Sequence, residues 1–378
     1  MSIELFTILL LVTFLLLLVS GLPLAWSMGA TAVLFTLIFF HPNMMVMMIG
    51  RIYHMMLNYG LVAAPLFILM AAILQQSGIA DQLFQAVYIW SGPFRGGLAI
   101  GTIISCTIMA AMVGIVGAEI VAFGLIALPS MLKRGYDDRI ALGSVCAGGG
   151  MGTLIPPSVV FIVYAMTAGA SIGDLFIGGI IPGILLATLF IGYIVVASWL
   201  KPEMAPAAPI EERDIPFARK LVMLKGVIMP GILAFAVLGS IYAGVATPTE
   251  AGGLGCVGAV ITSIVNRKFS FKGLWEAMHE TVKVTCMLAW LFFGAQTIIG
   301  VYALAGGTTF VQNAVLALPF GKWGIMIGMQ LILIFLGMFL DWIGIVLLTM
   351  RLFVPIVEDL GFDIVWFGVV FCMNMHIS

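Results

Sequence analysis

One run of glycine, proline and hydroxyl residues interrupts an apolar stretch of this chain. The run is Gly148-Gly149-Gly150-Met151-Gly152-Thr153-Leu154-Ile155-Pro156-Pro157-Ser158. A bilayer tolerates a broken helix only where the break is buried in protein or lines a watery cavity. Carbonyls freed at such a break can hold a cation, and freed amides can hold an anion. The run therefore predicts a site for ions and a small solute near the middle of a membrane. The candidate solute contacts within it are Thr153, Pro156, Pro157 and Ser158.

Two carboxylates lie in other long apolar stretches. Residues 100–132 and 325–357 are each too long for one crossing, and Glu119 and Asp341 lie near their Gly-containing interruptions. Both stretches are typical of re-entrant hairpins. A carboxylate inside a membrane is costly and indicates function by default. The alternative is that each acid only caps its hairpin or pairs with a neighbour. No basic residue is close in sequence, so a bound cation is a reasonable partner.

The composition indicates a helical membrane protein. Of 378 residues, 62% are hydrophobic and only 9% charged, whereas a soluble domain has roughly a quarter charged residues. The apolar runs do not alternate as barrel strands would. The net charge of −1 gives no indication of nucleic-acid binding. The five cysteines lack metal-ligand spacing, and no Walker loop, nucleophile elbow or zinc motif is present, so we expect neither an enzyme nor a cofactor.

The apolar runs predict the membrane-spanning helices. We expect them at about 3–20, 25–41, 60–76, 140–166 (broken), 175–199, 226–243, 250–266, 284–304 and 362–378. The stretch 43–58 contains Arg51 and His54, which favours an interfacial helix. In Ala246-Thr247-Pro248-Thr249-Glu250-Ala251 we expect Thr249 to cap the helix that follows, with Glu250 in its first turn.

The two halves of the chain share a pattern. Pro129 is followed by Gly135-Tyr136-Asp137 and an apolar helix, and Pro355 is followed at the same spacing by Gly361-Phe362-Asp363 and an apolar helix. In this register Asn374 matches the Gly149 region and becomes a second candidate solute contact. The counterpart of Pro156-Pro157 would lie beyond Ser378, so we expect the second half to be truncated.

Charge predicts the orientation. Loops 133–139, 201–225 and 267–283 are rich in Lys and Arg and are expected in the cytoplasm, whereas the loop at Glu358 is acidic. Five crossings between residues 139 and 358 would place the two hairpins on opposite sides of the membrane. The predicted fold is an all-α polytopic membrane protein with inverted repeats, two re-entrant hairpins and broken helices.

The predicted domains follow from these repeats. We expect scaffold helices at 1–95 and 226–322, a first transport repeat at 96–200, a cytoplasmic linker at 201–225 and a truncated second transport repeat at 323–378.

At this point the sequence resembles the large membrane subunit of the TRAP (tripartite ATP-independent periplasmic) transporters. The resemblance covers essentially the whole chain and is carried by three motifs, Ala246-Thr247-Pro248-Thr249-Glu250-Ala251, Leu154-Ile155-Pro156-Pro157-Ser158 and Gly337-Met338-Phe339-Leu340-Asp341. The form Asp341-Trp342-Ile343-Gly344 is similar to the branch labelled mannitol/chloroaromatic type, a label that says little about substrate.

The resemblance implies a multi-pass importer of the bacterial or archaeal inner membrane. A periplasmic binding protein would deliver a small organic anion, often a carboxylate, and a small four-helix membrane subunit would pack beside the large one. A sodium gradient would drive an elevator-like movement of the transport domain.

The resemblance also implies two sodium sites. The first would lie between a hairpin tip (Gly114, Gly117) and the break that contains Gly149, Gly150 and Gly152. The second would involve Asp341, Gly344 and Asn374. The first tip lacks the small hydroxyl residues often found in the family, so its ligands would be mostly carbonyls.

Other functions remain open at this stage. One alternative is a stand-alone ion-coupled carrier of the same inverted-repeat superfamily, which protons would drive through His376 or Asp341. A channel would need a continuous polar pore, but the charged residues cluster in loops. An intramembrane enzyme would need a nucleophile and base or a metal set, which the sequence does not show.

Overall fold

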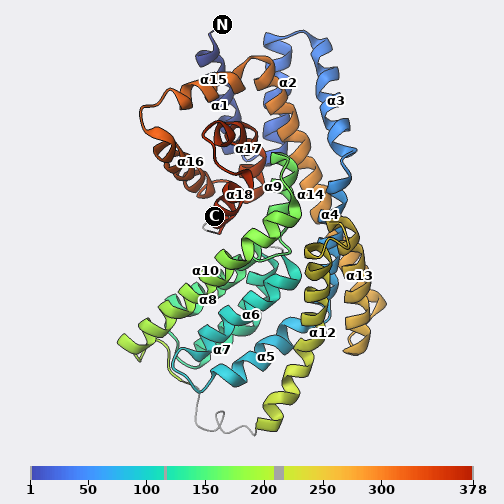
Figure 1. The fold of residues 1–378 in the computed structure, drawn as a ribbon, viewed down its shortest axis with the longest axis vertical. Helices are drawn as coiled ribbons and strands as arrows, with labels where there is room; N and C mark the ends of the chain where they lie inside the picture. Colours follow the sequence, from blue (N-terminus) through green and yellow to red (C-terminus); the bar gives the residue numbers. More distant parts are fainter. Residues whose placement is uncertain (1, 115–116, 208–216, 377–378) are drawn as a thin grey trace. The chain divides into compact units, whose positions relative to one another are not determined.

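The described part of the chain is helical throughout. A computed structural model describes residues 2–114, 117–207 and 217–376, and these contain helices and turns but no strand. Four helical segments in these ranges are long and apolar enough to cross a membrane, namely Tyr59–Gln76, Ile172–Leu200, Pro248–Val265 and Phe271–Leu304. The predicted all-α polytopic membrane protein is therefore confirmed (Figure 1).

The residues group into two compact units. The first unit comprises the described parts of Met1–Leu61, Val163–Ser171 and Lys283–Ser378, and the second comprises Val62–Ile162 and Ile172–Val282. Both units are therefore built from separated stretches of sequence. The predicted division into scaffold and transport segments remains a prediction.

The first unit contains two short N-terminal helices, a helical hairpin and the helices around them. Its elements are α1 (Ile3–Val19), α2 (Leu24–Phe39), η1 (Pro42–Met44), α3 (Met45–Met56), most of α14 (Phe271–Leu304), α15 (Gly307–Leu316), the hairpin α16 (Gly321–Gly337) and α17 (Trp342–Asp359), and α18 (Ile364–Met375). The Trp26 ring stacks on Trp290 with 5.1 Å between ring centroids, which joins α2 to α14. This unit also contains the part of α9 (Val159–Ala168) from Val163 onward, where the Tyr164 hydroxyl donates to the Ile364 carbonyl at 2.7 Å and joins α9 to α18.

The second unit surrounds the other helical hairpin. Its elements are α4 (Ala63–Gln76), α5 (Ile79–Ser91), the hairpin α6 (Gly97–Val113) and α7 (Ala118–Lys133), α8 (Asp138–Gly149), η3 (Gly150–Thr153), the part of α9 (Val159–Ala168) up to Ile162, α10 (Ile172–Leu200), α12 (Phe217–Tyr242) and α13 (Pro248–Val265), while η2 (Tyr59–Val62) ends at the boundary with the first unit. Both arms of the hairpin pack against α8. The buried rings of Phe67 and Phe161 both meet Phe176 edge-on, so α4, α9 and α10 share one core.

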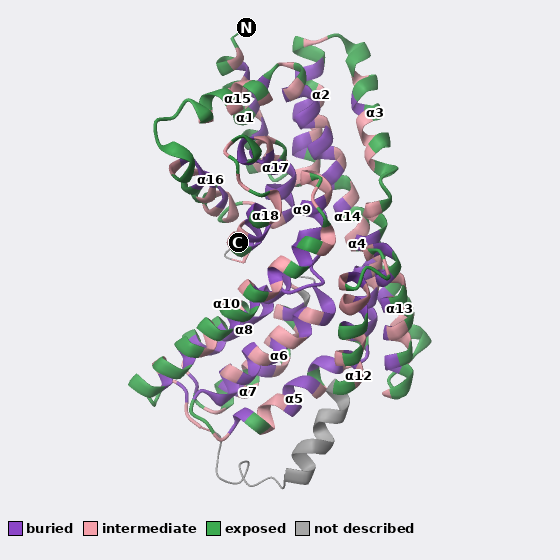
Figure 2. Ribbon diagram, viewed as in Figure 1, coloured by how far each residue is buried: buried purple, intermediate pink, exposed green. Residues whose placement is uncertain are grey.

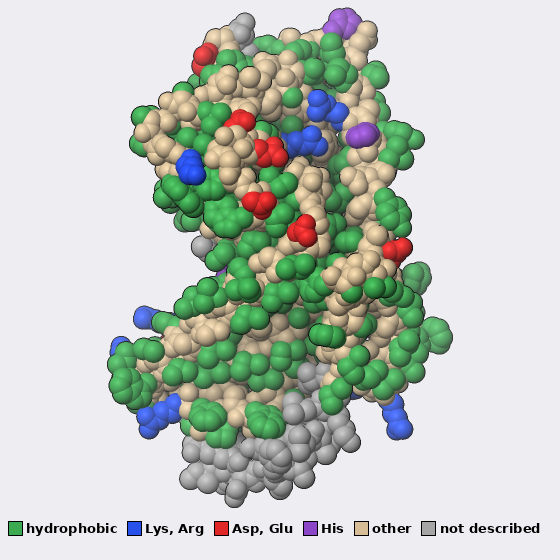
Figure 3. Space-filling view, in the orientation of Figure 1, with side chains coloured by type: hydrophobic (Ala, Val, Ile, Leu, Met, Phe, Trp, Pro, Cys, Tyr) green, Lys and Arg blue, Asp and Glu red, His purple; other side chains and the backbone are tan. Residues whose placement is uncertain are grey.

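The outward face of α10 is apolar. Ile181 and Trp199 are each 77% exposed, whereas Phe176 on the inner face is fully buried. Figure 2 shows this change of burial around α10, and Figure 3 shows hydrophobic side chains over it on the face in view. An exposed apolar face of this length is what contact with lipid requires.

The same turn occurs after each hairpin. Pro129 lies inside α7 and Pro355 inside α17. Gly135 and Gly361 follow with φ of 76° and 75°, a left-handed conformation that favours glycine. The next helices, α8 and α18, begin after Asp137 and Asp363, whose carboxylates accept backbone N–H groups as N-caps. Both helices contain 12 residues, so the repeat seen in the sequence extends to local structure.

Four helices differ from the sequence prediction. Helices α5 and α15 were not predicted, because each is short and carries polar residues among its apolar ones. Helix α14 begins at Phe271, inside the predicted loop 267–283. Lys272 and Glu276 are one turn apart and form an ion pair at 3.9 Å, which suits a charged helical extension that hydropathy alone overlooks. Helix α12 likewise begins at Phe217, within the predicted linker.

The prediction that Thr249 caps α13 was wrong. The N-cap is Thr247, whose hydroxyl oxygen accepts the Glu250 N–H, while a Glu250 carboxylate oxygen accepts the Thr247 N–H at 2.8 Å. Pro248 occupies the first helical position, where its missing N–H costs nothing. The helix therefore begins two residues earlier, and the motif is a reciprocal capping box.

Candidate ion and solute site

The predicted helix break is present. Helix α8 ends at Gly149, η3 covers Gly150–Thr153, and α9 begins only at Val159. The hydroxyl of Thr153 donates to the Gly150 carbonyl at 2.9 Å, and that of Ser158 donates to the Thr153 carbonyl at 2.8 Å. The intervening Pro156-Pro157 peptide bond is cis. The whole break is buried, so local side chains take up part of the hydrogen bonding that the missing helix would have supplied.

The first hairpin tip lies directly against this break. Helix α6 ends at Gly114 with φ of +61°, and a Cβ atom there would lie 1.7 Å from the Pro157 carbonyl oxygen. The Val159 N–H donates to the Gly114 carbonyl at 3.3 Å. Only glycine allows this close approach of one backbone to the other.

A second close approach lies beside the first. A Cβ atom at Gly149 would lie 2.3 Å from the Ile120 Cγ1 atom, so the first turn of α7 rests on the last turn of α8. Gly117, with φ of 90°, forms the N-cap of α7, while Ile115 and Val116 lie outside the described residues. Gly150 and Gly152 are buried in η3. The structure thus packs both arms of the first hairpin against the elements that contain Gly149, Gly150 and Gly152, while the ion site itself remains a prediction.

Glu119 is buried beside this contact. Its side chain is fully buried in the first turn of α7, and neither carboxylate oxygen has a hydrogen-bond partner among the described residues. The thiol of Cys106 on α6 is close enough to interact with it electrostatically. Among the described residues, no hydrogen bond pairs this carboxylate with a neighbour or makes it a helix cap, so none offsets the cost of its burial.

The second predicted set is less closely assembled. Asp341 is exposed and is the N-cap of α17, where its carboxylate accepts the Ile343 N–H at 3.3 Å. Gly344 lies within the first turn of α17, not at the tip, and a Cβ there would lie 2.3 Å from Leu24 Cδ2. No hydrogen bond between described residues joins Asp341 to Asn374.

Asn374 has a partner that the sequence did not reveal. Its side-chain amide donates to the Gln330 carbonyl oxygen on α16. Both residues are polar positions in apolar helices of the same unit, which is the only signal that could have paired them. Ser378, which follows Asn374 in the counterpart of the helix break, lies outside the described part of the chain.

A polytopic helical chain in which a hairpin tip is packed onto a broken helix has the architecture of a secondary transporter. Residues 11–378 match the family described as "Tripartite ATP-independent periplasmic transporter, DctM component". The chain therefore belongs to the family of TRAP transporter large membrane subunits, and its resemblance to that family is confirmed.

Two relatives illustrate the range of this family. The chain is 31% identical over 353 residues to the C4-dicarboxylate TRAP transporter large permease protein DctM of Pseudomonas aeruginosa, covering 93% of this chain and 81% of the relative. It is 27% identical over 363 residues to the 2,3-diketo-L-gulonate TRAP transporter large permease protein YiaN of Escherichia coli, covering 95% and 83%. Both relatives are transporter permeases, so the chain is a multi-pass membrane protein of a transport family.

The fold is also similar to a solved structure. The Alcanivorax borkumensis YdaH transporter, whose crystal structure revealed an unusual topology, aligns with a TM-score of 0.57 and 13% sequence identity. The alignment covers 88% of this chain and 76% of that chain. At this identity the likeness concerns the fold alone.

Proposed function

We propose that the chain is the large subunit of a sodium-coupled importer that takes up a small organic anion delivered by a binding protein. The observation that carries this proposal is the hairpin tip at Gly114 closed onto the buried break at Gly149–Ser158. Such a contact can hold an ion with backbone carbonyls only while it is closed. The names of the two relatives refer to carboxylates, which favours that class of solute.

The coupling ion would be held by the two predicted sets of residues, with no other cofactor. The first set is Gly114, Gly117, Gly149, Gly150 and Gly152, which lie together in the second unit. The second is Asp341, Gly344 and Asn374 in the first unit. Asp341 supplies the only negative charge among them, and a carboxylate oxygen is a suitable ligand for a hard cation.

The solute would contact Thr153, Pro156, Pro157, Ser158 and Asn374. Thr153 and Ser158 are 1% and 0% exposed, so a solute reaches them only after the tip and the break separate. Ion-dependent closing of the tip would then prevent leak in the absence of solute. An elevator-like movement would carry the loaded site across the bacterial inner membrane, with loops 133–139, 201–225 and 267–283 in the cytoplasm.

Reconstitution into liposomes tests this function. The full-length protein is combined with its small four-helix membrane subunit and periplasmic binding protein, and uptake of the labelled solute is followed with and without an inward sodium gradient. We expect uptake only with both the gradient and the binding protein. Uptake without the binding protein would indicate the stand-alone carrier instead, and uptake driven by a proton gradient alone would rule out sodium coupling.

Asp341→Asn is the decisive variant. Asparagine caps a helix about as well as aspartate, so α17 keeps its N-cap while the charge is lost. We expect at least a tenfold loss of sodium-driven uptake with unchanged expression and complex assembly. Lys322→Gln removes a charge from the neighbouring helix α16 and serves as the matched control, which should retain uptake. Unchanged sodium dependence in Asp341→Asn would show that this residue is only a cap.

A further inference from the structure

The first unit contains a cavity of about 780 Å³, which is within the range of small-molecule sites. Its walls come from α3, the end of α9, α14 and α17, and its lining includes none of the residues of the predicted ion and solute sites. The polar side chains that line it are Arg51, His54, Asn58, Thr167, Gln296 and Arg351.

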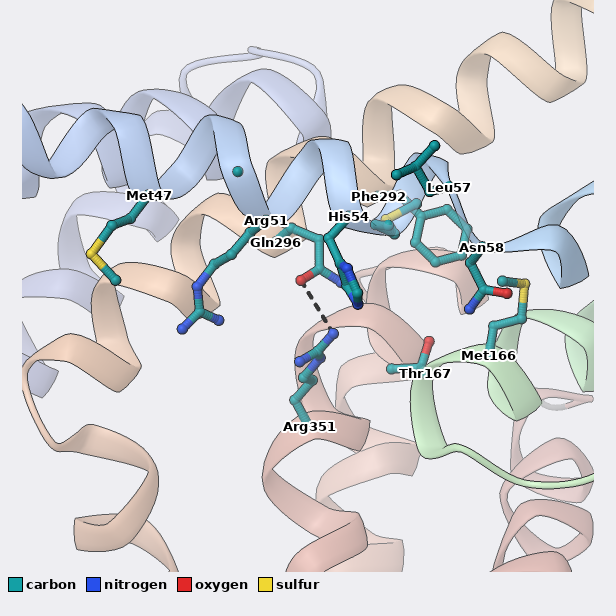
Figure 4. Close-up of a pocket in the computed structure, with 12 residues that line it drawn as sticks. Met47, Arg51, His54, Leu57, Asn58, Met166, Thr167, Phe292, Gln296 and Arg351 are labelled. Atoms are coloured by element: carbon teal, nitrogen blue, oxygen red, sulfur yellow. Dashed lines mark hydrogen bonds between the residues drawn. The ribbon is translucent and has the colours of Figure 1, made fainter.

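Three of these side chains come from the segment that begins with α3. Arg51 and His54 are three residues apart on α3, a spacing that places them on one side of the helix, and Asn58 follows just after the helix ends and lines the same cavity. Figure 4 shows Arg51 and His54 extending from α3 toward α17, and Arg351 extending from α17 toward them. Sequence spacing does not predict that these two arginines line one cavity, because Arg351 is 300 residues from Arg51.

Arg351 is held in place by a buried amide. Its Nη2 atom donates to the Gln296 carbonyl oxygen at 3.2 Å, and Gln296 is only 7% exposed (Figure 4). A guanidinium carries five N–H donors, so this single bond leaves others for a ligand. Gln296 therefore orients the guanidinium without neutralising it.

The Arg51 side chain lies against Gly300 of α14, the helix that also carries Gln296. A Cβ atom at Gly300, one turn after Gln296 on α14, would lie 3.1 Å from Arg51 Cδ and 3.4 Å from its Nε. The missing side chain thus leaves the space in which the Arg51 side chain runs along α14. Gln296 and Gly300 place the two arginines on adjacent turns of one wall.

The cavity has positive charge and no matching acid. No Asp or Glu lines it, and no carboxylate of the described residues forms an ion pair with Arg51 or Arg351. The Asn58 carbonyl oxygen accepts the Gly60 N–H at 3.0 Å, which leaves its NH₂ group as a further donor. Arg51 is half-buried and Arg351 is exposed, so a ligand can reach both guanidiniums. An anion between the two like charges would stabilise them, and their fork geometry suits carboxylate or phosphate oxygens.

We propose that this cavity binds an anionic oxygen group, a carboxylate or a phosphate, between Arg51 and Arg351, with His54 and Asn58 as additional donors. It would be an anion site separate from the broken helix. Identifying the anion as the transported solute rests on the function proposed above, whereas anion binding itself does not. The free carboxylate of an organic acid and the phosphate of a lipid headgroup are the two sources of such a group.

Binding to the purified full-length protein in neutral detergent, without sodium, tests the proposal independently of transport. The probes are potassium succinate and its neutral analogue succinamide at constant ionic strength, followed by thermal unfolding and by titration. We expect succinate, but not succinamide, to bind. Arg351→Gln and Arg51→Gln should each raise the succinate Kd about tenfold or more, as expected for loss of a charge-assisted hydrogen bond.

Matched variants show whether weaker succinate binding comes from the lost charge, from the changed geometry of the cavity or from impaired folding. Lys322→Gln removes a charge outside the cavity in the same unit and should leave the Kd within about twofold. Arg351→Lys keeps the charge and should bind better than Arg351→Gln. Gly300→Ala places a methyl group against Arg51 and should weaken binding, whereas Gly328→Ala, with nothing within 4 Å of its Cβ position, should not.

Nanodiscs of phosphatidylcholine, with or without phosphatidylglycerol, distinguish the two sources. Succinate binding that phosphatidylglycerol does not compete with identifies a free organic acid. Arg351-dependent stabilisation by phosphatidylglycerol identifies a lipid headgroup. The proposal is overturned if neither succinate nor phosphatidylglycerol stabilises the wild-type protein, or if both arginine variants bind as the wild type does. Normal sodium-driven uptake with no anion binding would reject this site and leave the proposed function intact.

Discussion

Glu119 is fully buried at the start of α7, next to the helix break, and its two carboxylate oxygens lack partners among the described residues. A carboxylate costs more to bury than an amide of the same shape unless a cation or a proton neutralises it. We therefore expect Glu119→Gln to unfold at the same temperature as the wild type or a higher one. Thermal unfolding of the purified protein, with and without sodium, measures this.

The sodium arm of that experiment shows what the carboxylate does. If sodium raises the unfolding temperature of the wild type but not of Glu119→Gln, the carboxylate contributes to a cation site in the first hairpin tip. If Glu119→Gln is markedly less stable in both conditions, the acid has a structural partner and the argument from burial is wrong. Glu276→Gln, an exposed acid of the same unit, is the control and should behave as the wild type.

At the scale of elements, the contact between the first hairpin tip and the break depends on one glycine. Gly114→Ala would place a methyl group 1.7 Å from the Pro157 carbonyl oxygen and would force alanine into a left-handed conformation that costs about 1–2 kcal/mol. The tip must therefore move away from the break. We expect a lower unfolding temperature and faster maleimide labelling of a cysteine placed at the buried position Ser158.

Gly143→Ala on α8 is the matched control, because nothing lies within 4 Å of its Cβ position. Alanine in the middle of an α-helix is more favourable than glycine, so this variant should be at least as stable as the wild type. Equal labelling of position 158 in Gly114→Ala and in the wild type would mean that the tip does not depend on Gly114.

Hydropathy and turn residues predicted the long apolar helices and the broken one, because lipid contact imposes a strong pattern on both. The repeat at Gly135 and Gly361 was likewise visible, since a left-handed turn favours glycine. The short helices α5 and α15 were missed because their apolar content is ordinary. The meeting of Arg51 with Arg351 was missed for another reason: it is a long-range contact, and sequence spacing carries no information about such contacts.

At the scale of the whole molecule, each unit is held together by contacts between distant stretches of sequence. Helices α4 and α13 pack closely, because Gly252 and Gly255 have no side chains and Leu66 and Met70 occupy the space where a Cβ atom would be. A Cβ at Gly255 would lie 2.5 Å from the Met70 sulfur. This contact joins the two sides of the polar linker.

We therefore expect a chain divided within the linker 201–225 to reassemble. Fragments 1–207 and 208–378, produced together, should copurify from membranes when only one carries a tag. Gly255→Leu, which fills the contact, should reduce copurification severalfold, whereas Gly253→Leu, with nothing within 4 Å of its Cβ position, should not. Fragments that copurify equally well with Gly255→Leu would show that another contact joins them.

The turn that follows each hairpin also bears on the history of the chain. The Pro, the left-handed Gly and the capping Asp occur twice, although the Asp137 carboxylate accepts the Arg139 N–H whereas the Asp363 carboxylate accepts the Trp366 N–H. Such recurrence is what two copies of a duplicated segment would retain at positions where backbone geometry leaves little freedom. The residues that the two segments share are those that the turn itself requires, a Gly in the left-handed conformation and an acceptor side chain at the helix N-terminus.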